Sequence, residues 1–386
     1  MSKNIYIASA ARTPVGSFQG SLSSLTAPEL GAHAIKATLT QANIEESKIS
    51  EAIFGNVVGA GLKQAPARQA MRNAGLPDAC GATTINKVCG SGMKAIMLAT
   101  DLLQADNGET ILAGGMESMS NAPYLIPKAR AGLRMGHQEI QDSLFLDGLE
   151  DAETGGSMGS FAQNTADEYQ LTRQDMDAYA TQSVTRARQA IEEKSLESEI
   201  KPIEIGAETI CDDEQPGRAK LDKISSLRPA FKADGTITAA NSSSISDGAS
   251  SVILTSNESL LNAEPLARIV GHATHSIHPS QFTIAPVGAI KKLIDKLAWQ
   301  LEEVDLFEIN EAFAMVTMLA IQELKLDPKK VNIYGGACAQ GHPIGSTGSR
   351  LVVTLAHAMK RLDMKKGIAA LCIGGGEATA VALERT

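Results

Sequence analysis

The feature that most constrains the fold is a weak internal repeat, in which apolar, strand-like segments recur in the two halves of the chain. The segment "EAIFGNVVGAG" at 51–61 resembles "DLFEINEAFAM" at 305–315, with an asparagine after a short apolar run in each. The segment "ETILAGGMES" at 109–118 resembles "AALCIGGGEA" at 369–378, where an apolar run leads into glycines and an acid. A chain that repeats its strands in this way is expected to contain a duplicated sheet unit.

Each glycine turn of the repeat follows an amphipathic stretch, at 92–106 and at 349–363. Apolar residues at helical spacing predict helices there, and strands alternating with helices predict an α/β fold. The copies lie far apart because residues 118–245, rich in glycine, proline, methionine and charge, separate them. We interpret 118–245 as an inserted loop lobe laid over the active face. The predicted units are a first half of residues 1–117 plus 246–268, this lobe, and a second half of residues 269–386.

Composition and charge exclude several classes of partner. The 386 residues have a formal net charge of −9, so neither a nucleic-acid surface nor an anionic-membrane surface is expected. The opening "MSKNIYIASAARTP" lacks the pattern of a signal peptide, and we expect a cytoplasmic protein. The five cysteines are odd in number and form no close pairs, which argues against a disulfide framework and against a zinc site. We therefore expect no metal.

The stretch "TINKVCGSGMKAIMLA" places Cys89 between a strand-like run and a helix that begins near Gly90. The positive end of that helix would face the sulfur, which predicts a lowered thiol pKa and a reactive thiolate. The first N–H groups of the helix also suit an oxyanion formed by attack on a carbonyl. Gly90 and Gly92 let a substrate approach the backbone closely. The alternative is a buried structural cysteine.

Three further segments contain candidate catalytic groups. His342 lies among glycines in "VNIYGGACAQGHPIGSTGSRL", just before a predicted helix, where it is suited to take the proton of Cys89. Cys372 ends a predicted strand in "LCIGGGEATA" and precedes three glycines. Asn310 ends another in "EINEAFAM", where its amide is available to a water or a carbonyl.

Taken together, "NKVCGSGMKA", "NEAFA", "GGACAQGHPIGSTG" and "CIGGG" resemble the signature segments of the thiolases, the acetyl-CoA acetyltransferases in particular. The likeness runs nearly end to end. It includes, in the expected order, "ASAARTPVGSFQGSL", "LAGGMESMSNAPYL", "LRMGHQEIQDSLFLDGL", "LRPAF" and "SISDGAS". The resemblance implies a five-layered fold of two βαβαβαββ halves, with the inserted lobe binding coenzyme A (CoA).

The resemblance also implies roles for the candidate residues. Cys89 would be the nucleophile that carries the acetyl group, and His342 would activate it. Cys372 would be the acid/base at the α-carbon of the second acetyl-CoA. The N–H groups of Cys89 and Gly374 would bind the thioester oxyanion, whereas His342 and a water on Asn310 would bind the enolate oxygen.

CoA contacts are implied at eight positions: Met158, Leu227, Phe231, Ala239, Ser243, Ile245, Ala312 and Phe313. Ser243 would meet the pantetheine amide. Many family members have a histidine before the methionine of the "MG" pair, where this chain has Ser157. The spacing before "LRPAF" is shortened, so Arg218 is the nearest basic residue for the CoA phosphates and Lys223 the next.

The leading prediction is an acetyl-CoA C-acetyltransferase that condenses two acetyl-CoA molecules to acetoacetyl-CoA and CoA, with CoA as substrate and no separate cofactor. The rival is a degradative 3-ketoacyl-CoA thiolase of fatty-acid metabolism, which uses the same residues. Phe282 would line the acyl pocket, and a large ring there favours short acyl groups. A non-catalytic acyl-CoA carrier would have lost Cys89, His342 or Cys372, and all three are present. A homotetramer is expected because residues 120–140 resemble a tetramer-forming loop.

Overall fold

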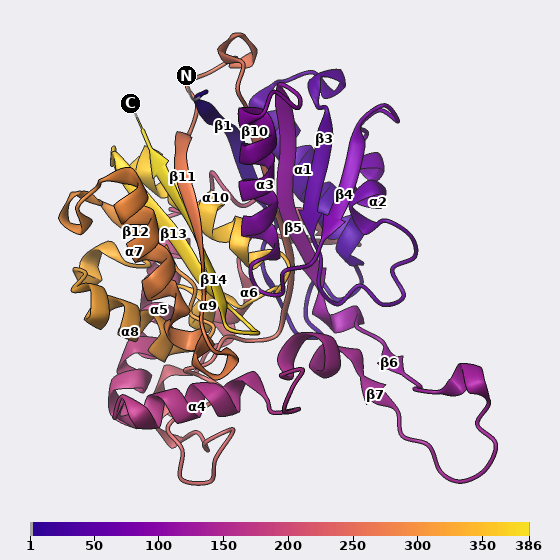
Figure 1. Ribbon diagram of the computed structural model, residues 1–386, viewed down its shortest axis with the longest axis vertical. Helices are drawn as coiled ribbons and strands as arrows, with labels where there is room; N and C mark the ends of the chain where they lie inside the picture. Colours follow the sequence, from indigo (N-terminus) through magenta and orange to yellow (C-terminus); the bar gives the residue numbers. More distant parts are fainter. Residues whose placement is uncertain (1–2, 386) are drawn as a thin grey trace.

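The computed structural model describes residues 3–385, and the sequence repeat corresponds to two copies of one strand arrangement (Figure 1). In the first half the strands lie in the order β4-β3-β5-β10-β1, where β3 is parallel to β4 and β5, and β10 is antiparallel to β5 and β1. The strands of this half are β1 (Ile5–Arg12), β3 (Glu51–Gly55), β4 (Gly81–Ile85), β5 (Thr110–Ser118) and β10 (Ser246–Thr255), with β2 (Gly16–Ser17) paired to β10.

The second half repeats this order as β12-β13-β14-β11. β12 is parallel to β13, and β14 is antiparallel to β13 and β11. In place of a fifth strand, Val331 forms a parallel bridge to Phe307. Pairing of Ile5 with Ile269 joins β1 to β11 and makes the two halves one continuous sheet. The strands of this half are β11 (Ala267–Ser276), β12 (Leu306–Ile309), β13 (Lys366–Ile373) and β14 (Glu377–Glu384).

The helices complete five layers, as predicted. α3 and α10 pack against each other between the two halves, and their apolar side chains share one core with strands of both halves. α1 and α2 cover the outer face of the first half, whereas α7 and α8 cover that of the second. The bounds of these helices are α1 (Ala27–Ala42), α2 (Pro66–Asn73), α3 (Ser91–Gln104), α7 (Ala285–Leu297), α8 (Ala314–Leu324) and α10 (Thr347–Arg361).

Local sequence explains where these helices begin. The carboxylate of Glu29 accepts the backbone N–H of Thr26 at 2.8 Å, which is one bond of a capping box at the start of α1. By contrast, α3 begins after Gly90 with no side-chain cap, so its first N–H groups stay available to another partner. α10 is buried from Thr347 to Met359 because it packs against strands of both halves and against α3.

The lobe between β5 and β10 packs beside the second half through α4 and α5, while the hairpin β6–β7 projects away from both halves (Figure 1). The boundaries predicted at 117/118, 245/246 and 268/269 stay a prediction.

Within residues 3–385, no helix is both long and apolar enough to cross a membrane. The lobe contains α4 (Met158–Glu168), α5 (Arg173–Glu192), α6 (Glu214–Arg218), β6 (Tyr124–Leu125), β7 (Gln141–Asp142), β8 (Ile203–Ile205) and β9 (Glu208–Ile210), and α9 (Ala337–Gln340) follows α8 in the second half.

Candidate active site

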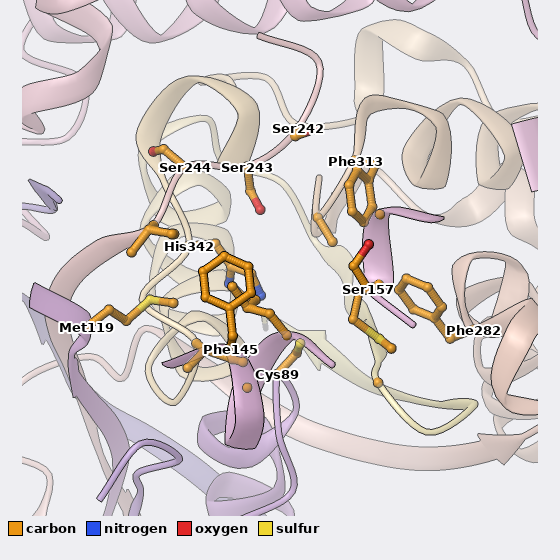
Figure 2. Close-up of a pocket in the computed structure, with 18 of the residues that line it drawn as sticks. Cys89, Met119, Phe145, Ser157, Ser242, Ser243, Ser244, Phe282, Phe313 and His342 are labelled. Atoms are coloured by element: carbon orange, nitrogen blue, oxygen red, sulfur yellow. The ribbon is translucent and has the colours of Figure 1, made fainter. Parts of the chain in front are cut away.

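A cavity of about 240 Å³ lies where the two halves and the lobe meet. Figure 2 shows Cys89 and His342 near one another in it, with Phe282 and Phe313 along another wall. The π-helical turn Phe145–Leu149 of the lobe also borders it. Ten of the predicted site residues line the cavity: Cys89, Met158, Phe231, Ser243, Ile245, Phe282, Ala312, Phe313, His342 and Gly374.

The turn that presents Cys89 is built from its neighbours. The Ser91 hydroxyl accepts the N–H of Lys87 at 2.8 Å and donates to the carbonyl of Val88 at 2.7 Å. Val88 adopts a φ of +47°, an unfavourable conformation for a β-branched residue. A side chain at Gly90 would overlap Ile373 of the second half. The turn therefore needs glycine next to the thiol, and it stores backbone strain beside Cys89.

The electrostatics of Cys89 differ from the sequence-based expectation. Burial raises the pKa of the Cys89 thiol to about 11, although hydrogen bonds from the N–H groups of Gly374 and Cys89 itself lower it. The predicted lowering of the thiol pKa is thus wrong for the resting site, because desolvation of the thiolate outweighs these N–H groups. A thiol with this pKa needs a base before it attacks.

His342, which lines the same cavity as Cys89, is the candidate for that base. Its Nδ1 lies 2.5 Å from the Thr347 hydroxyl, which donates its own proton to the carbonyl of Pro343 at 3.0 Å. The hydroxyl therefore accepts from His342, which places the imidazole proton on Nδ1. Nε2 has no partner among the described residues. Burial, with Arg350 as a second cause, lowers the pKa of His342 to about 3, so the ring is neutral and its Nε2 lone pair is free.

Cys372 and Asn310 do not line the cavity, although Cys372 packs in one apolar cluster with Phe282 and Phe313. Cys372 is fully buried at the end of β13, and burial, with Cys89 as a second cause, raises its pKa well above the ordinary thiol value. Asn310 follows β12, and its backbone N–H donates to Ala370 at 3.0 Å. Both side-chain polar atoms of Asn310 are buried without a partner in the part of the chain that the structure describes. Such groups are costly to leave unpaired, which indicates a site for a ligand or water.

Aromatic rings form the apolar wall of the cavity. Phe313 contacts Phe282 edge-on at a centroid distance of 6.5 Å and Phe231 at 6.1 Å. The Phe231 ring occupies the space that a side chain at Gly159 would need. Phe282 itself is only 3% exposed, so it fills the wall rather than projecting into solvent.

Three predicted CoA contacts lie outside the cavity lining: Arg218, Leu227 and Ala239. Arg218 is exposed on α6 and pairs with Glu214 at 2.7 Å. Ala239 is exposed, and Leu227 is half-buried with its carbonyl bound to Arg173 at 3.0 Å.

Nine cavity residues were not predicted as substrate contacts: Met119, Phe145, Gly148, Leu149, Ser157, Gly159, Ser242, Ser244 and Ile344. Most belong to the lobe, where irregular sequence gives no period from which to assign an inward face. Ser157 caps α4 by accepting the N–H of Ser160 at 3.2 Å. In the sequence, a serine directly before "MGSF" is a helix-capping pattern, and this pattern could have placed Ser157 at the start of α4.

Comparison with known proteins gives a consistent result over the whole chain. Residues 5–258 match the family model described as thiolase, N-terminal domain, and residues 263–385 match thiolase, C-terminal domain. A Schizosaccharomyces pombe protein named acetyl-CoA acetyltransferase is 45% identical over 389 residues, covering 99% of this chain and 98% of the relative. A Pseudomonas aeruginosa protein of the same name is 46% identical over 394 residues, covering 99% and 100%. The crystal structure of the Acat5 thiolase from Ascaris suum in complex with coenzyme A matches with a TM-score of 0.95, at 40% identity and over 100% of both chains.

Proposed function

This chain belongs to the thiolase family, and we propose that it is an acetyl-CoA C-acetyltransferase that reversibly condenses two acetyl-CoA molecules to acetoacetyl-CoA and CoA. Relatives of that name match it from end to end. The observation that carries the proposal is that Cys89, His342 and the Gly374 N–H meet in one cavity, while Cys372 packs in one apolar cluster with two rings of its wall.

The first half-reaction transfers an acetyl group to Cys89. The free Nε2 of His342 takes the thiol proton, and the thiolate attacks the carbonyl carbon of acetyl-CoA. The N–H groups of Cys89 and Gly374 stabilise the oxyanion. When the carbon–sulfur bond to CoA breaks, Cys372 gives its proton to the departing CoA thiolate. The products are acetyl-Cys89, free CoA, a Cys372 thiolate and a protonated His342.

The second half-reaction forms the carbon–carbon bond. The Cys372 thiolate takes a proton from the methyl group of a second acetyl-CoA. His342 and a water on Asn310 stabilise the enolate oxygen, which gives the unpaired Asn310 amide a role. The enolate carbon attacks acetyl-Cys89, and collapse of the adduct releases acetoacetyl-CoA. His342 returns its proton to the Cys89 thiolate, which closes the proton balance.

CoA follows the apolar wall in this proposal. Met158, Phe231, Ser243, Ile245, Ala312 and Phe313 border the pantetheine and adenine, and Ser243 meets the pantetheine amide. Arg218 binds the CoA phosphates in this proposal, and Lys223 is the alternative. To do so, the Arg218 side chain would have to break its salt bridge with Glu214. Leu227 and Ala239 would contact the adenine end from the rim.

The rival activity, degradative 3-ketoacyl-CoA thiolysis of long chains, differs only in the acyl pocket. The buried, edge-packed ring of Phe282 supports the short-chain assignment. The deciding experiment compares thiolysis of acetoacetyl-CoA with that of 3-ketohexadecanoyl-CoA. After mixing with acetyl-CoA, mass spectrometry should also find acetyl on the Cys89 peptide. Faster thiolysis of 3-ketohexadecanoyl-CoA than of acetoacetyl-CoA would overturn the short-chain assignment. An acetyl group on a residue other than Cys89 would overturn the mechanism.

We also propose a cytoplasmic homotetramer that serves fatty-acid metabolism. The hairpin region supports the assembly because it projects from the body and exposes large apolar side chains, which commonly mark interfaces. Those side chains are Tyr124, Ile126, Leu133, Met135 and Ile140. Light scattering after size exclusion should give about four chains in the native protein and fewer when charges replace Ile126 and Ile140.

A further inference from the structure

Glu117, at the end of β5, is fully buried yet has no role in the reaction steps above. Its carboxylate accepts four hydrogen bonds, two at each oxygen. Oε1 accepts from the Asn56 amide at 2.7 Å and the Val58 N–H at 3.2 Å. Oε2 accepts from the N–H groups of Val57 and Gly345, both at 2.9 Å. Burial raises the pKa of Glu117 to about 8, whereas the three backbone N–H groups lower it.

Gly345 is the one partner of Glu117 that comes from the second half. Its carbonyl oxygen enters a space left free by three glycines of the first half. A side chain at Gly55 would meet this oxygen at 2.8 Å and one at Gly92 at 3.0 Å, and one at Gly115 would overlap it. A side chain on Gly345 itself would meet the Glu117 carboxylate at 2.6 Å. The Gly345 peptide is thus clamped at its carbonyl by glycines and at its N–H by a carboxylate.

This clamp lies within three residues of both reacting groups. Gly345 follows His342 by three positions, and Gly92 follows Cys89 by three. Thr347, which orients the His342 ring, begins the helix immediately after the clamped peptide. The clamp therefore sets the position of the base, on one half, relative to the nucleophile, on the other.

We propose that Glu117 is a positioning residue, which docks the Gly345 peptide so that His342 reaches the Cys89 thiol. The proposal deepens the proposed acyl-transfer mechanism and rests on it. Glu117 does not line the cavity. Although burial raises the pKa of Glu117 to about 8, all four of its partners are donors, so this geometry fits the ionised carboxylate. In Glu117→Gln, the amide nitrogen would face two N–H groups, which costs two hydrogen bonds and loosens the loop.

The test measures the single-turnover rate of Cys89 acetylation by quenched mass spectrometry, together with kcat and KM for thiolysis of acetoacetyl-CoA. We expect Glu117→Gln to lower the acetylation rate and kcat about 10- to 100-fold, because small misplacements of reacting groups have effects of this size. KM should stay within about twofold, since substrate contacts are unchanged. An acetylation rate and kcat within about twofold of wild type would overturn the proposal.

A matched pair of glycine variants separates positioning from general damage. Gly115→Ala and Gly114→Ala change adjacent buried residues of β5, and each new side chain would overlap a backbone carbonyl oxygen. Only at Gly115 is that oxygen the one of Gly345; at Gly114 it belongs to Ser250. Both should lower the unfolding midpoint, but only Gly115→Ala should slow acetylation per folded molecule.

Equal slowing in the two glycine variants would overturn the positioning role. An inactive wild type would instead refute the proposed function, so the two failures are distinguishable. If Gly115→Ala does not fold, Glu117→Gln alone decides the outcome.

Discussion

The ends of the parallel strands differ between the two halves in what their polar groups contact. Asn56 directly follows β3 in the first half, and Asn310 directly follows β12 in the second. The last residue of β3, Gly55, pairs with Gly115, and the last residue of β12, Ile309, pairs with Ala370. Glu117 and Cys372 each lie two residues after these paired positions and are therefore counterparts. Asn56 donates to Glu117 at 2.7 Å, whereas both polar atoms of Asn310 lack a partner among residues 3–385. The asparagine at the strand end is therefore paired with Glu117 in the first half, whereas in the second half the amide of Asn310 has no partner in the part of the chain that the structure describes.

This difference indicates that the strand ends of the first half stabilise the structure, whereas the corresponding strand ends of the second half take part in the reaction. An unpaired buried amide costs about 1–3 kcal/mol of stability, so a duplicated fold has no reason to keep one unless a ligand uses it. The first half uses its buried carboxylate to fix a loop, while the second places a thiol where a proton has to move.

The largest expected effect follows from Cys372→Ala, which removes the base of the second half. Acetyl-Cys89 should still form, though more slowly, because Cys89 and His342 remain. Exchange of the acetyl methyl protons with deuterium should fall about 10²–10⁴-fold, since no positioned base meets the α-carbon. NMR follows the exchange, and mass spectrometry follows the acetyl group.

Cys80→Ala is the control for this loss of a buried thiol, since Cys80 lies in the outer core of the first half, away from the cavity. Its exchange rate should match that of wild type. Exchange at the wild-type rate in Cys372→Ala would show that the base is another group, with His342 the first candidate.

A second prediction concerns the resting state of Cys89 and His342. With the pKa of Cys89 near 11 and that of His342 near 3, both groups are neutral at pH 7. Alkylation of Cys89 by iodoacetamide should therefore rise about tenfold per pH unit from 7 to 10, as the thiolate fraction grows. Peptide mapping over this range gives the rate for Cys89 alone. A plateau near neutral pH would mean that a thiolate–imidazolium pair already exists.

The duplicated fold was predictable because it leaves local patterns, and so was the presence of Cys89 and His342 in one cavity, whereas their catalytic roles stay a prediction. Strand, glycine and helix recur at both copies, and Cys89, His342 and Cys372 each stand beside glycines. The clamp was not predictable, because Glu117 meets Val57 and Gly345 only through tertiary contacts. The raised pKa of Cys89 was missed for a similar reason, since its cause is burial by several distant segments rather than the helix start beside it.

The third prediction compares truncation of the two asparagines, Asn310 and Asn56, by its effects on activity and on stability. Asn310→Ala should lower kcat for condensation about 10²-fold, as loss of an oxyanion contact does, with little loss of stability. Asn56→Ala should cost about 1–3 kcal/mol of stability, because Glu117 loses a donor in a buried site, and should reduce kcat less. Urea unfolding and steady-state kinetics on both variants give the answer. A larger stability loss in Asn310→Ala than in Asn56→Ala would break the comparison.

The smallest expected effect on activity distinguishes the segments that lead into the first helix of each half. Phe282 precedes α7 and reaches the cavity, whereas Leu22 precedes α1 and packs into the outer core. Phe282→Ala should open the acyl wall. Because one buried methylene is worth about 0.8 kcal/mol, an extension of two or three carbons should gain about tenfold or more in relative kcat/KM.

Leu22→Ala is the matched truncation in the first half. It should cost about 2–5 kcal/mol of stability and leave the chain-length profile unchanged, because no substrate contacts that core. The measurement is kcat/KM for 3-ketoacyl-CoA substrates of four, six and eight carbons in both variants, alongside urea unfolding. If Phe282→Ala keeps the wild-type profile, the acyl wall lies elsewhere. If Leu22→Ala shifts the profile, the first half takes part in substrate selection, and its segment is not purely structural.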